Sequence, residues 1–287
     1  MVRGFHLASI ICMLLETARA AIPQLTNYHV VWADDFNGPQ GSATDRSYWN
    51  QITPTKNSNG ELQRYTDSPA NAHLSGDGQL YIIPKRSPND NTWTSARLES
   101  TGSWVCPPGK AMVYQAEIRV PDFSTGSAQF KGLWPAFWAL GNSVRWQNVR
   151  WPQCGEWDIL EAASPLRGQN QGTLHFLDAG GHLNSSLQNR VAYQGGAYHT
   201  WALKVDRRSG DWRQQKLTWY LDGNPFHSVT GAQIGHLQQW TELAYMKFFV
   251  ILNVAVGGGF PGNPTAATVG GYEASMRVRY VGVYESN

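Results

Sequence analysis

The sequence contains little charge and has almost no excess of either sign. Asp, Glu, Lys and Arg make up 15% of its 287 residues, and the formal net charge is +2. Without residues 1–20, which hold Arg3, Arg19 and Glu16, 21 basic and 20 acidic residues remain and the charge falls to +1. Nucleic-acid binding needs a concentrated basic surface. We therefore expect no nucleic-acid partner.

Long apolar stretches are also lacking. The largely apolar run at residues 5–15 is shorter than the roughly 20 residues that cross a bilayer, and no later run reaches that length. With Arg3 before it and a small-x-small site at residues 18–20 after it, the run predicts a secretory signal peptide over residues 1–20. Residues 21–287 show no linker or repeat and are expected to form a single domain. We expect a secreted, extracellular or wall-associated monomer with no membrane partner.

Cysteine is scarce, with three residues of which Cys12 falls within the signal segment. In an oxidising compartment Cys106 and Cys154 would pair, closing a loop of 48 residues and stabilising the fold by about 3–4 kcal/mol. Two buried free thiols are the alternative. A sequon at residues 184–186 predicts glycosylation of Asn184.

Helical periodicity is nearly absent, and short β-rich runs separated by Gly, Pro, Asn and Asp clusters take its place. In residues 276–284, for example, Met276, Val278 and Tyr280 alternate with Arg277 and Arg279. An Asp-Gly pair at residues 222–223 predicts a tight hairpin turn. This pattern favours an all-β sandwich of two antiparallel sheets. The expected strands are residues 29–36, 79–85, 112–120, 200–206, 216–221, 248–256 and 276–284.

Three carboxylates fall within residues 156–161, which read EWDILE. On a regular strand Glu156 and Asp158 share one face, whereas Glu161 points to the other. A β-bulge at Ile159 and Leu160 would return Glu161 to the face of the other two, and bulges recur beside active sites. Carboxylates held so close raise one another's pKa, as general acid catalysis requires. The alternative is a solvated acidic edge strand.

Tryptophan is abundant, with 13 residues. Trp157 alternates with the acids and is therefore expected in the core between the sheets. Trp134 and Trp138 flank residues 135–137 just before the acidic run, where their flat faces could hold the apolar faces of sugar rings. A role in the core is the alternative for either one.

Taken together, these features make the sequence resemble glycoside hydrolase family 16, in particular its secreted, fungal-like endo-β-1,3(4)-glucanases of the laminarinase and lichenase type. The resemblance covers most of residues 21–287 and keeps the family's order of motifs. The matching blocks are WADDF at 32–36, NGELQRY at 59–65, TSARL at 94–98, GLWPAFW at 132–138, GEWDILE at 155–161, GTLH at 172–175, YHTW at 198–201, WYLDG at 219–223 and LNVAVGG at 252–258.

The resemblance implies a concanavalin-like jelly roll with a concave cleft for a linear polysaccharide. It also implies that Glu156 is the nucleophile, Glu161 the general acid/base and Asp158 the residue that tunes them. In a retaining hydrolase one carboxylate attacks the anomeric carbon while the other protonates the leaving oxygen. No cofactor is implied, and the histidines lack a metal-ligand spacing such as H-E-x-x-H.

Weaker assignments follow from the same motifs. Asn59, Glu61 and Arg97 match family positions that hydrogen-bond sugars near the cleavage point, and His175 matches one close to the acid pair. Each could instead be a structural hydrogen-bonding residue. Trp157 departs from the family, which more often has Ile at this position.

A second departure concerns calcium. Many relatives bind a structural calcium partly through an Asp in the final strand, where this sequence has Arg279. An arginine would replace a needed oxygen ligand by a positive charge, so we expect this calcium site to be missing.

The sequence therefore predicts a retaining endo-hydrolase that cuts β-1,3 or mixed β-1,3/1,4 linkages of a β-glucan. The bulged E-x-D-x-x-E form favours hydrolysis, because family branches that mainly transglycosylate usually have E-x-D-x-E. A hydrolase or transglycosylase of another polymer, such as a galactan or chitin-linked glucan, is the alternative on the same fold. A glucan-binding protein without activity is a third possibility, although such relatives lack the catalytic acids.

Overall fold

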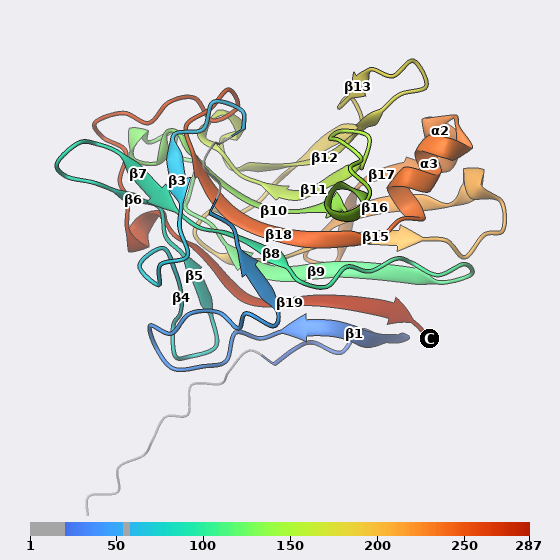
Figure 1. The fold of residues 1–287 in the computed structure, drawn as a ribbon, viewed down its shortest axis with the longest axis horizontal. Coiled ribbons are helices and arrows are strands. Elements are labelled where there is room, and N and C mark those ends of the chain that lie inside the picture. Colours follow the sequence, from blue (N-terminus) through green and yellow to red (C-terminus); the bar gives the residue numbers. More distant parts are fainter. Residues whose placement is uncertain (1–20, 54–57) are drawn as a thin grey trace, which may run out of the picture.

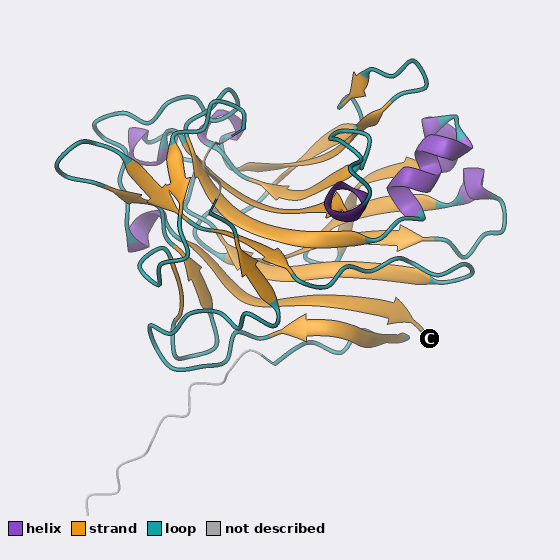
Figure 2. Ribbon diagram, in the orientation of Figure 1, coloured by secondary structure: helices purple, strands orange, loops and turns teal. Residues whose placement is uncertain are grey.

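The computed structural model describes residues 21–53 and 58–287, which fold into two stacked antiparallel sheets (Figures 1 and 2). The expected signal peptide at residues 1–20 lies outside the described residues. The outer sheet has the order β17-β16-β15-β9-β19-β5-β4, and β1 also pairs with β19. Its strands are β1 (Tyr28–Asp34), β4 (Ala72–Leu74), β5 (Leu80–Ile82), β9 (Ala111–Arg119), β15 (Tyr198–Asp206), β16 (Lys216–Leu221), β17 (Asn224–Thr230) and β19 (Met276–Ser286).

The second sheet is called the cleft sheet, because the cleft described below lies on its outward face. Its order is β13-β12-β11-β10-β18-β8-β2, and β14 also pairs with β12. The strands are β2 (Trp49–Gln51), β8 (Arg97–Ser100), β10 (Leu133–Gly141), β11 (Glu156–Glu161), β12 (Gln169–Leu177), β13 (Leu183–Asn184), β14 (Gln188–Ala192) and β18 (Phe248–Val256). The all-β jelly-roll sandwich expected from the sequence is confirmed.

Smaller elements cover the ends of the sandwich. A three-stranded sheet is formed by β3 (Gln63–Tyr65), β7 (Trp93–Ser95) and β6 (Lys85–Arg86). In the described part of the chain three short α-helices occur, namely α1 (Ser143–Trp146) after β10, α2 (Gly231–Ile234) after β17, and α3 (Leu237–Ala244) after α2. Among residues 21–53 and 58–287, none of the helices combines the length and the apolar character needed to span a bilayer.

The core lies between the two sheets and is built from the apolar faces of their strands. Alternation in β9 buries Met112, Tyr114 and every second residue after them on this side. Trp157 is 1% exposed and stacks on Phe248, with ring centres 3.6 Å apart and planes at 11°. Its ring also meets Tyr114 edge-on. The expectation that Trp157 belongs to the core is confirmed.

The β16–β17 hairpin turns at Asp222 and Gly223, with φ values of 49° and 77°. Both residues are in the left-handed region that a type I′ turn requires, so the predicted Asp-Gly turn is confirmed. The run at residues 79–85, predicted as one strand, instead forms β5 and β6 with Pro84 between them. Proline has no N–H to donate to a sheet, which explains the break.

The final strand differs from the predicted alternation. The register of β19 against β9 shifts between Val278 and Tyr280, so Arg279 is the extra residue of a bulge. Beyond it, Val281 and Val283 face the core, whereas Tyr280 accepts a hydrogen bond from Gln115 at 2.8 Å. The bulge therefore breaks the predicted alternation after Val278 and separates Tyr280 from the face of Met276 and Val278, although Tyr280 is still buried.

The expected disulfide is also corrected, because both cysteines are free and buried. Cys106 belongs to the main core and lies near the backbone of β15, with Sγ 3.5 Å from the Val205 carbonyl oxygen. Cys154 packs instead with Leu140 and Phe249 on the cleft sheet. The two thiols thus sit in separate apolar clusters, and burial raises the pKa of each to about 12.

Candidate active site

A β-bulge in β11 places the three carboxylates on one face. Phe137 of β10 pairs with Leu160, but the next residue, Trp138, pairs with Asp158, so Ile159 is the extra residue. Glu156, Asp158 and Glu161 consequently pair with every second residue of β10 and line the same cleft. The bulge and its effect on Glu161 are as predicted. The cavity in the cleft measures about 650 Å³.

Buried side chains satisfy the backbone groups that the bulge leaves without a strand partner. Asn170 is fully buried; its amide nitrogen donates to the Ile159 carbonyl at 3.0 Å, and its oxygen accepts from the Glu161 N–H at 2.8 Å. Trp219 donates to the Asp158 carbonyl at 2.7 Å. Since unpaired buried backbone groups are costly, Asn170 makes the irregular strand stable.

Burial dominates the electrostatics of the three acids. Removal from water raises the pKa of Glu156 and of Glu161 well above the ordinary value, and the neighbouring charge of Asp158 raises both further. Burial also raises the pKa of Asp158 to about 8. At neutral pH the cluster therefore retains protons, which a general acid must do.

Two tryptophans oppose this effect by donating hydrogen bonds. The Trp151 indole N–H donates to Glu156 Oε2 at 3.0 Å, and that of Trp134 donates to Glu161 Oε1 at 3.1 Å. Each bond favours the ionised carboxylate and lowers its pKa. Trp151 was not identified from the sequence, although it lies only five residues before Glu156.

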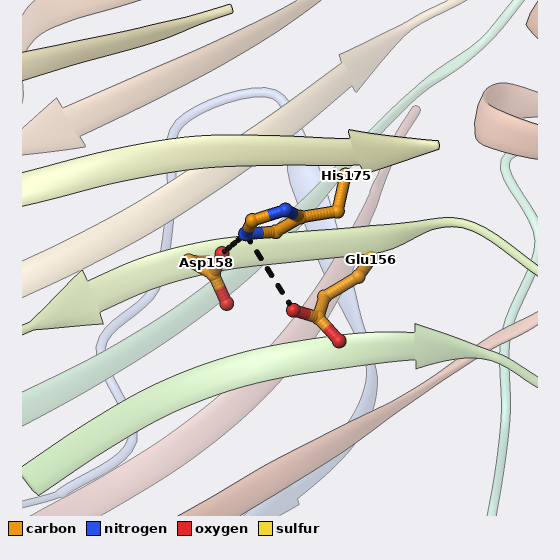
Figure 3. Close-up of side chains that lie close together, drawn as sticks. All are labelled: Glu156, Asp158 and His175. Atoms are coloured by element: carbon orange, nitrogen blue, oxygen red, sulfur yellow. Dashed lines mark ion pairs between the residues drawn. The ribbon is translucent and has the colours of Figure 1, made fainter. Parts of the chain in front are cut away.

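His175 of β12 faces two of the acids (Figure 3). Its Nε2 lies 2.9 Å from Asp158 Oδ2 and 3.7 Å from Glu156 Oε1, while Nδ1 lies 2.6 Å from Ser185 Oγ. The contact with Asp158 is short but falls outside hydrogen-bond geometry, since Oδ2 has no hydrogen-bond partner among the residues that the structure describes. His175 is therefore close to the acid pair, as the family motif implies.

This group could also hold a cation. Glu156, Asp158 and His175 each offer one ligand atom, and these atoms lie within 4.8 Å of one another. A charge contact between His175 and the two acids accounts for the same proximity. That no metal takes part in the chemistry stays a prediction.

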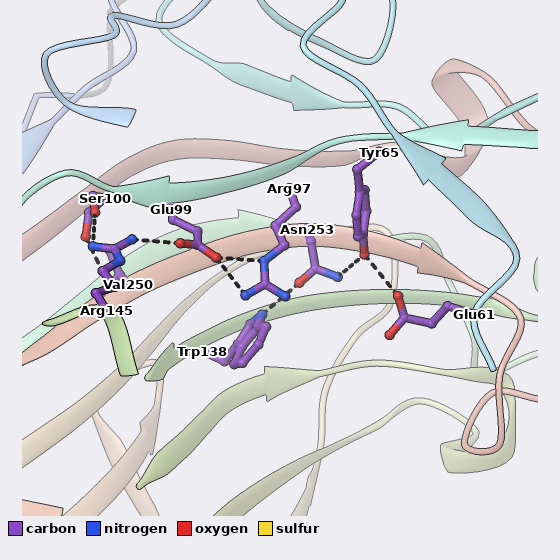
Figure 4. Close-up of polar contacts among 9 residues, drawn as sticks. All are labelled: Glu61, Tyr65, Arg97, Glu99, Ser100, Trp138, Arg145, Val250 and Asn253. Atoms are coloured by element: carbon purple, nitrogen blue, oxygen red, sulfur yellow. Dashed lines mark hydrogen bonds and ion pairs between the residues drawn. The ribbon is translucent and has the colours of Figure 1, made fainter. Parts of the chain in front are cut away.

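The remaining predicted residues line the same cavity, and Figure 4 shows three of them, Glu61, Arg97 and Trp138. The Arg97 guanidinium lies 4.8 Å from the centre of the Trp138 ring, and the Trp138 indole donates to Asn253 at 2.7 Å. Trp134 and Trp138 are both partly buried and line the cavity, so neither is a residue of the core between the sheets.

Asn59 and Glu61 reach the cleft from the loop before β3. Asn59 has a φ of 57°, in the left-handed region, and its carbonyl accepts from the Gly259 N–H at 3.1 Å. Glu61 accepts from Gln63 at 2.7 Å, and burial raises its pKa. Cleft residues not identified from the sequence include Trp151, Tyr65, Gln171, Gln188, Asn253 and Phe260.

Asn184 ends β13, where its side-chain oxygen accepts from the N–H and hydroxyl of Ser186 at 3.0 and 2.9 Å. The residue is partly exposed. Its glycosylation stays a prediction.

Comparison with known proteins finds similar proteins among the glucanases. A family model described as "XgeA-like, catalytic GH16 domain" matches residues 109–213. The chain is 31% identical over 244 residues to a glucan endo-1,3-beta-glucosidase of Cryptopygus antarcticus, covering 80% of this chain and 81% of the relative. It is 30% identical over 298 residues to glucan endo-1,3-beta-glucosidase A1 of Niallia circulans, but spans only 39% of that protein while 92% of this chain is covered.

A solved structure agrees. The crystal structure of an endo-1,3-beta-glucanase from Streptomyces sioyaensis superposes with a TM-score of 0.83 at 30% sequence identity, covering 93% of this chain and all of that one.

Proposed function

The chain belongs to glycoside hydrolase family 16, and on that premise we propose that it is a retaining endo-hydrolase of β-glucan. Its substrates are glucans with β-1,3 or mixed β-1,3/1,4 linkages. The observation that carries this proposal is the bulge at Ile159, which brings Glu156 and Glu161 to the same face of β11. Without that extra residue the strand would offer one carboxylate fewer to the cleft.

The reaction proceeds by double displacement. Glu156, as the ionised carboxylate, attacks the anomeric carbon, while Glu161 donates its proton to the leaving glycosidic oxygen. The covalent glycosyl-enzyme removes the negative charge of Glu156, so the pKa of Glu161 falls and the residue can accept a proton from the attacking water. Release of the sugar then restores both protonation states.

The surrounding residues support these two roles. Trp151 donates to Glu156 and so favours the form that attacks. Glu161 is 8% exposed, and burial raises its pKa, which favours the protonated form that a general acid needs. Asp158 lies between the two on the same face and couples their titration, with His175 beside it.

The cleft binds sugars mainly through aromatic and planar groups. Trp134, Trp138 and the Arg97 guanidinium offer flat faces, and Asn59 and Glu61 offer polar atoms that hydrogen-bond hydroxyl groups. This mixture suits a neutral polymer with apolar ring faces and many hydroxyls.

A polymeric glucan is too large to cross a membrane, so an enzyme that cuts it acts where the polymer lies. We therefore also propose that the protein is secreted, acts as a monomer and loses residues 1–20. N-terminal sequencing of the protein from the culture medium of its producer tests the cleavage. A mature chain that still begins at residue 1 would contradict it.

Product analysis tests the proposed reaction. Purified enzyme should release oligosaccharides from laminarin or barley β-glucan, and proton NMR of the earliest product should show the β-anomer. The Glu156→Ala variant should lose turnover by a factor of roughly 10⁴ or more while retaining glucan binding. If the enzyme cleaves agarose but neither glucan, the proposed substrate is wrong and the enzyme acts on a galactan instead.

A further inference from the structure

Glu99 lies on β8, two residues after the cleft residue Arg97 and between two arginines (Figure 4). Its Oε1 accepts from Nε and Nη2 of Arg97 at 3.0 and 2.7 Å, and its Oε2 accepts from Nη2 of Arg145 at 2.7 Å. The Glu99 side chain is 12% exposed, less than that of Arg97 at 24% or Arg145 at 19%. It is therefore the buried member that joins two more exposed cations.

The bond to Glu99 fixes how Arg97 meets the cleft. A free arginine has many rotamers, but two hydrogen bonds to one carboxylate oxygen restrict its guanidinium to one plane. In this position the Arg97 guanidinium lies over the ring of Trp138, whose indole N–H donates a hydrogen bond to Asn253. No hydrogen bond joins Arg97 Nη1 to another residue of the described part of the chain, so this nitrogen is available to a sugar hydroxyl.

Through Arg145, Glu99 also contacts a second segment beside the cleft, which begins with α1. Arg145 belongs to α1 and lies 3.4 Å from the centre of the Phe249 ring, while donating to the Ser100 carbonyl at 3.0 Å. The loop after α1 carries Trp151, the residue that contacts Glu156. Glu99 thus links Arg97, which lines the cleft, to the segment that carries Trp151 and contacts the proposed nucleophile Glu156.

Glu99 also lowers the net positive charge beside the cleft. Arg97, Glu99 and Arg145 carry one net positive charge together; without Glu99 the same place would carry two. Partly buried charges act strongly on a ligand because water screens them little. A neutral sugar gains nothing from the second charge, whereas a carboxylated or sulfated sugar does.

We propose that Glu99 is a positioning and specificity-determining residue, which holds Arg97 over Trp138 and makes the cleft prefer neutral to anionic glucan. This inference rests on the proposed function, since it takes β-glucan as the ligand. Glu99 acts through Arg97 and needs no contact with the sugar.

Binding measurements in the inactive Glu156→Ala background test the positioning role. Glu99→Gln keeps the size of the side chain and removes its charge. We expect its affinity for a neutral β-1,3-glucan tetrasaccharide to fall by roughly 10–100-fold, the range of one charge-assisted hydrogen bond. In an Arg97→Gln background the same change should have no further effect, because the group through which Glu99 acts is gone.

A matched control separates this role from plain stabilisation. Asp206 on β15 of the outer sheet is likewise buried and paired with an arginine two residues later, Arg208, whose Nε donates to it at 2.9 Å. Asp206→Asn should lower the melting temperature as Glu99→Gln does, yet leave glucan affinity unchanged. If both variants lose affinity in proportion to stability, Glu99 is only structural and the inference is wrong.

Specificity is tested with a carboxymethylated tetrasaccharide. Glu99→Gln should increase its affinity relative to the neutral sugar by at least fivefold, and about 1 M salt should reduce the gain without abolishing it, because the charges are partly buried. An unchanged preference would overturn the inference.

If Glu99→Gln does not fold, the Arg97→Gln/Glu99→Gln double variant replaces it in the binding test. An affinity for the neutral tetrasaccharide equal to that of Arg97→Gln supports the inference, whereas a weaker affinity refutes it. Failure of the wild-type enzyme to cleave any glucan would refute the proposed function instead.

Discussion

Replacing Trp151 by Phe would remove one hydrogen bond to Glu156 and keep an aromatic ring in the cleft. The bond spans 3.0 Å and favours the ionised carboxylate, so its loss raises the pKa of Glu156. Hydrogen bonds to charged groups contribute about 1.5–3 kcal/mol. Trp151 is 47% exposed, so water can replace part of the contact, and about 1 kcal/mol remains, equal to about 0.7 pH unit.

The direction of the shift depends on the role of Glu156. A nucleophile must be ionised, so a higher pKa moves the acid limb of the kcat/KM profile upward by about 0.7 pH unit. The matched variant is Trp134→Phe, which removes the corresponding bond to Glu161. A general acid must be protonated, so this second change should move the alkaline limb upward instead.

Profiles of kcat/KM between pH 4 and 9 on a soluble β-glucan would distinguish the two variants. The two acids are coupled, so each change has a smaller effect on the other limb. The assignment is refuted if Trp134→Phe moves the acid limb and Trp151→Phe the alkaline one, because Glu161 would then be the nucleophile.

Further predictions concern the acid, the bulge and the metal. Glu161→Gln should reduce activity on natural glucan at least 100-fold more than on an aryl glycoside with an activated leaving group, and equal losses in initial-rate assays would argue against Glu161 as the acid. Asn170→Ala leaves the Glu161 N–H and the Ile159 carbonyl unpaired in a buried place, so urea unfolding should show a loss of about 2–4 kcal/mol; a loss below about 0.5 kcal/mol would mean that the bulge does not need this side chain. Arg279 forms an ion pair with Glu117 at 2.9 Å, and we expect EDTA to leave the melting temperature unchanged, whereas a sharp drop would reveal a calcium site.

Much of the fold could be predicted because alternation and turn residues are local signals. The strands Lys216–Leu221 and Phe248–Val256 have the predicted bounds, since each is a compact run bounded by polar or glycine residues. The bulge at Arg279 could not be predicted in the same way. It is defined by the register against β9, which pairing between distant segments decides.

In the active site, too, some features could be predicted from the sequence and others could not. The bulge in β11 was predictable because a regular strand would have separated Glu161 from the other acids. The cysteines were misjudged because two thiols in one chain give no information on their separation in space, and here they lie in different apolar clusters. Asn170 had no signal, because an asparagine that completes a bulge resembles any other in sequence.

Trapping the covalent intermediate tests the central assignment most directly. A β-1,3-glucan oligosaccharyl fluoride with fluorine at C2 of its reducing-end sugar should inactivate the enzyme, because the fluorine slows release of the glycosyl group more than its formation. Peptide mass spectrometry should then find the sugar esterified to Glu156. A label on Glu161, or inactivation without any labelled peptide, would contradict double displacement through Glu156.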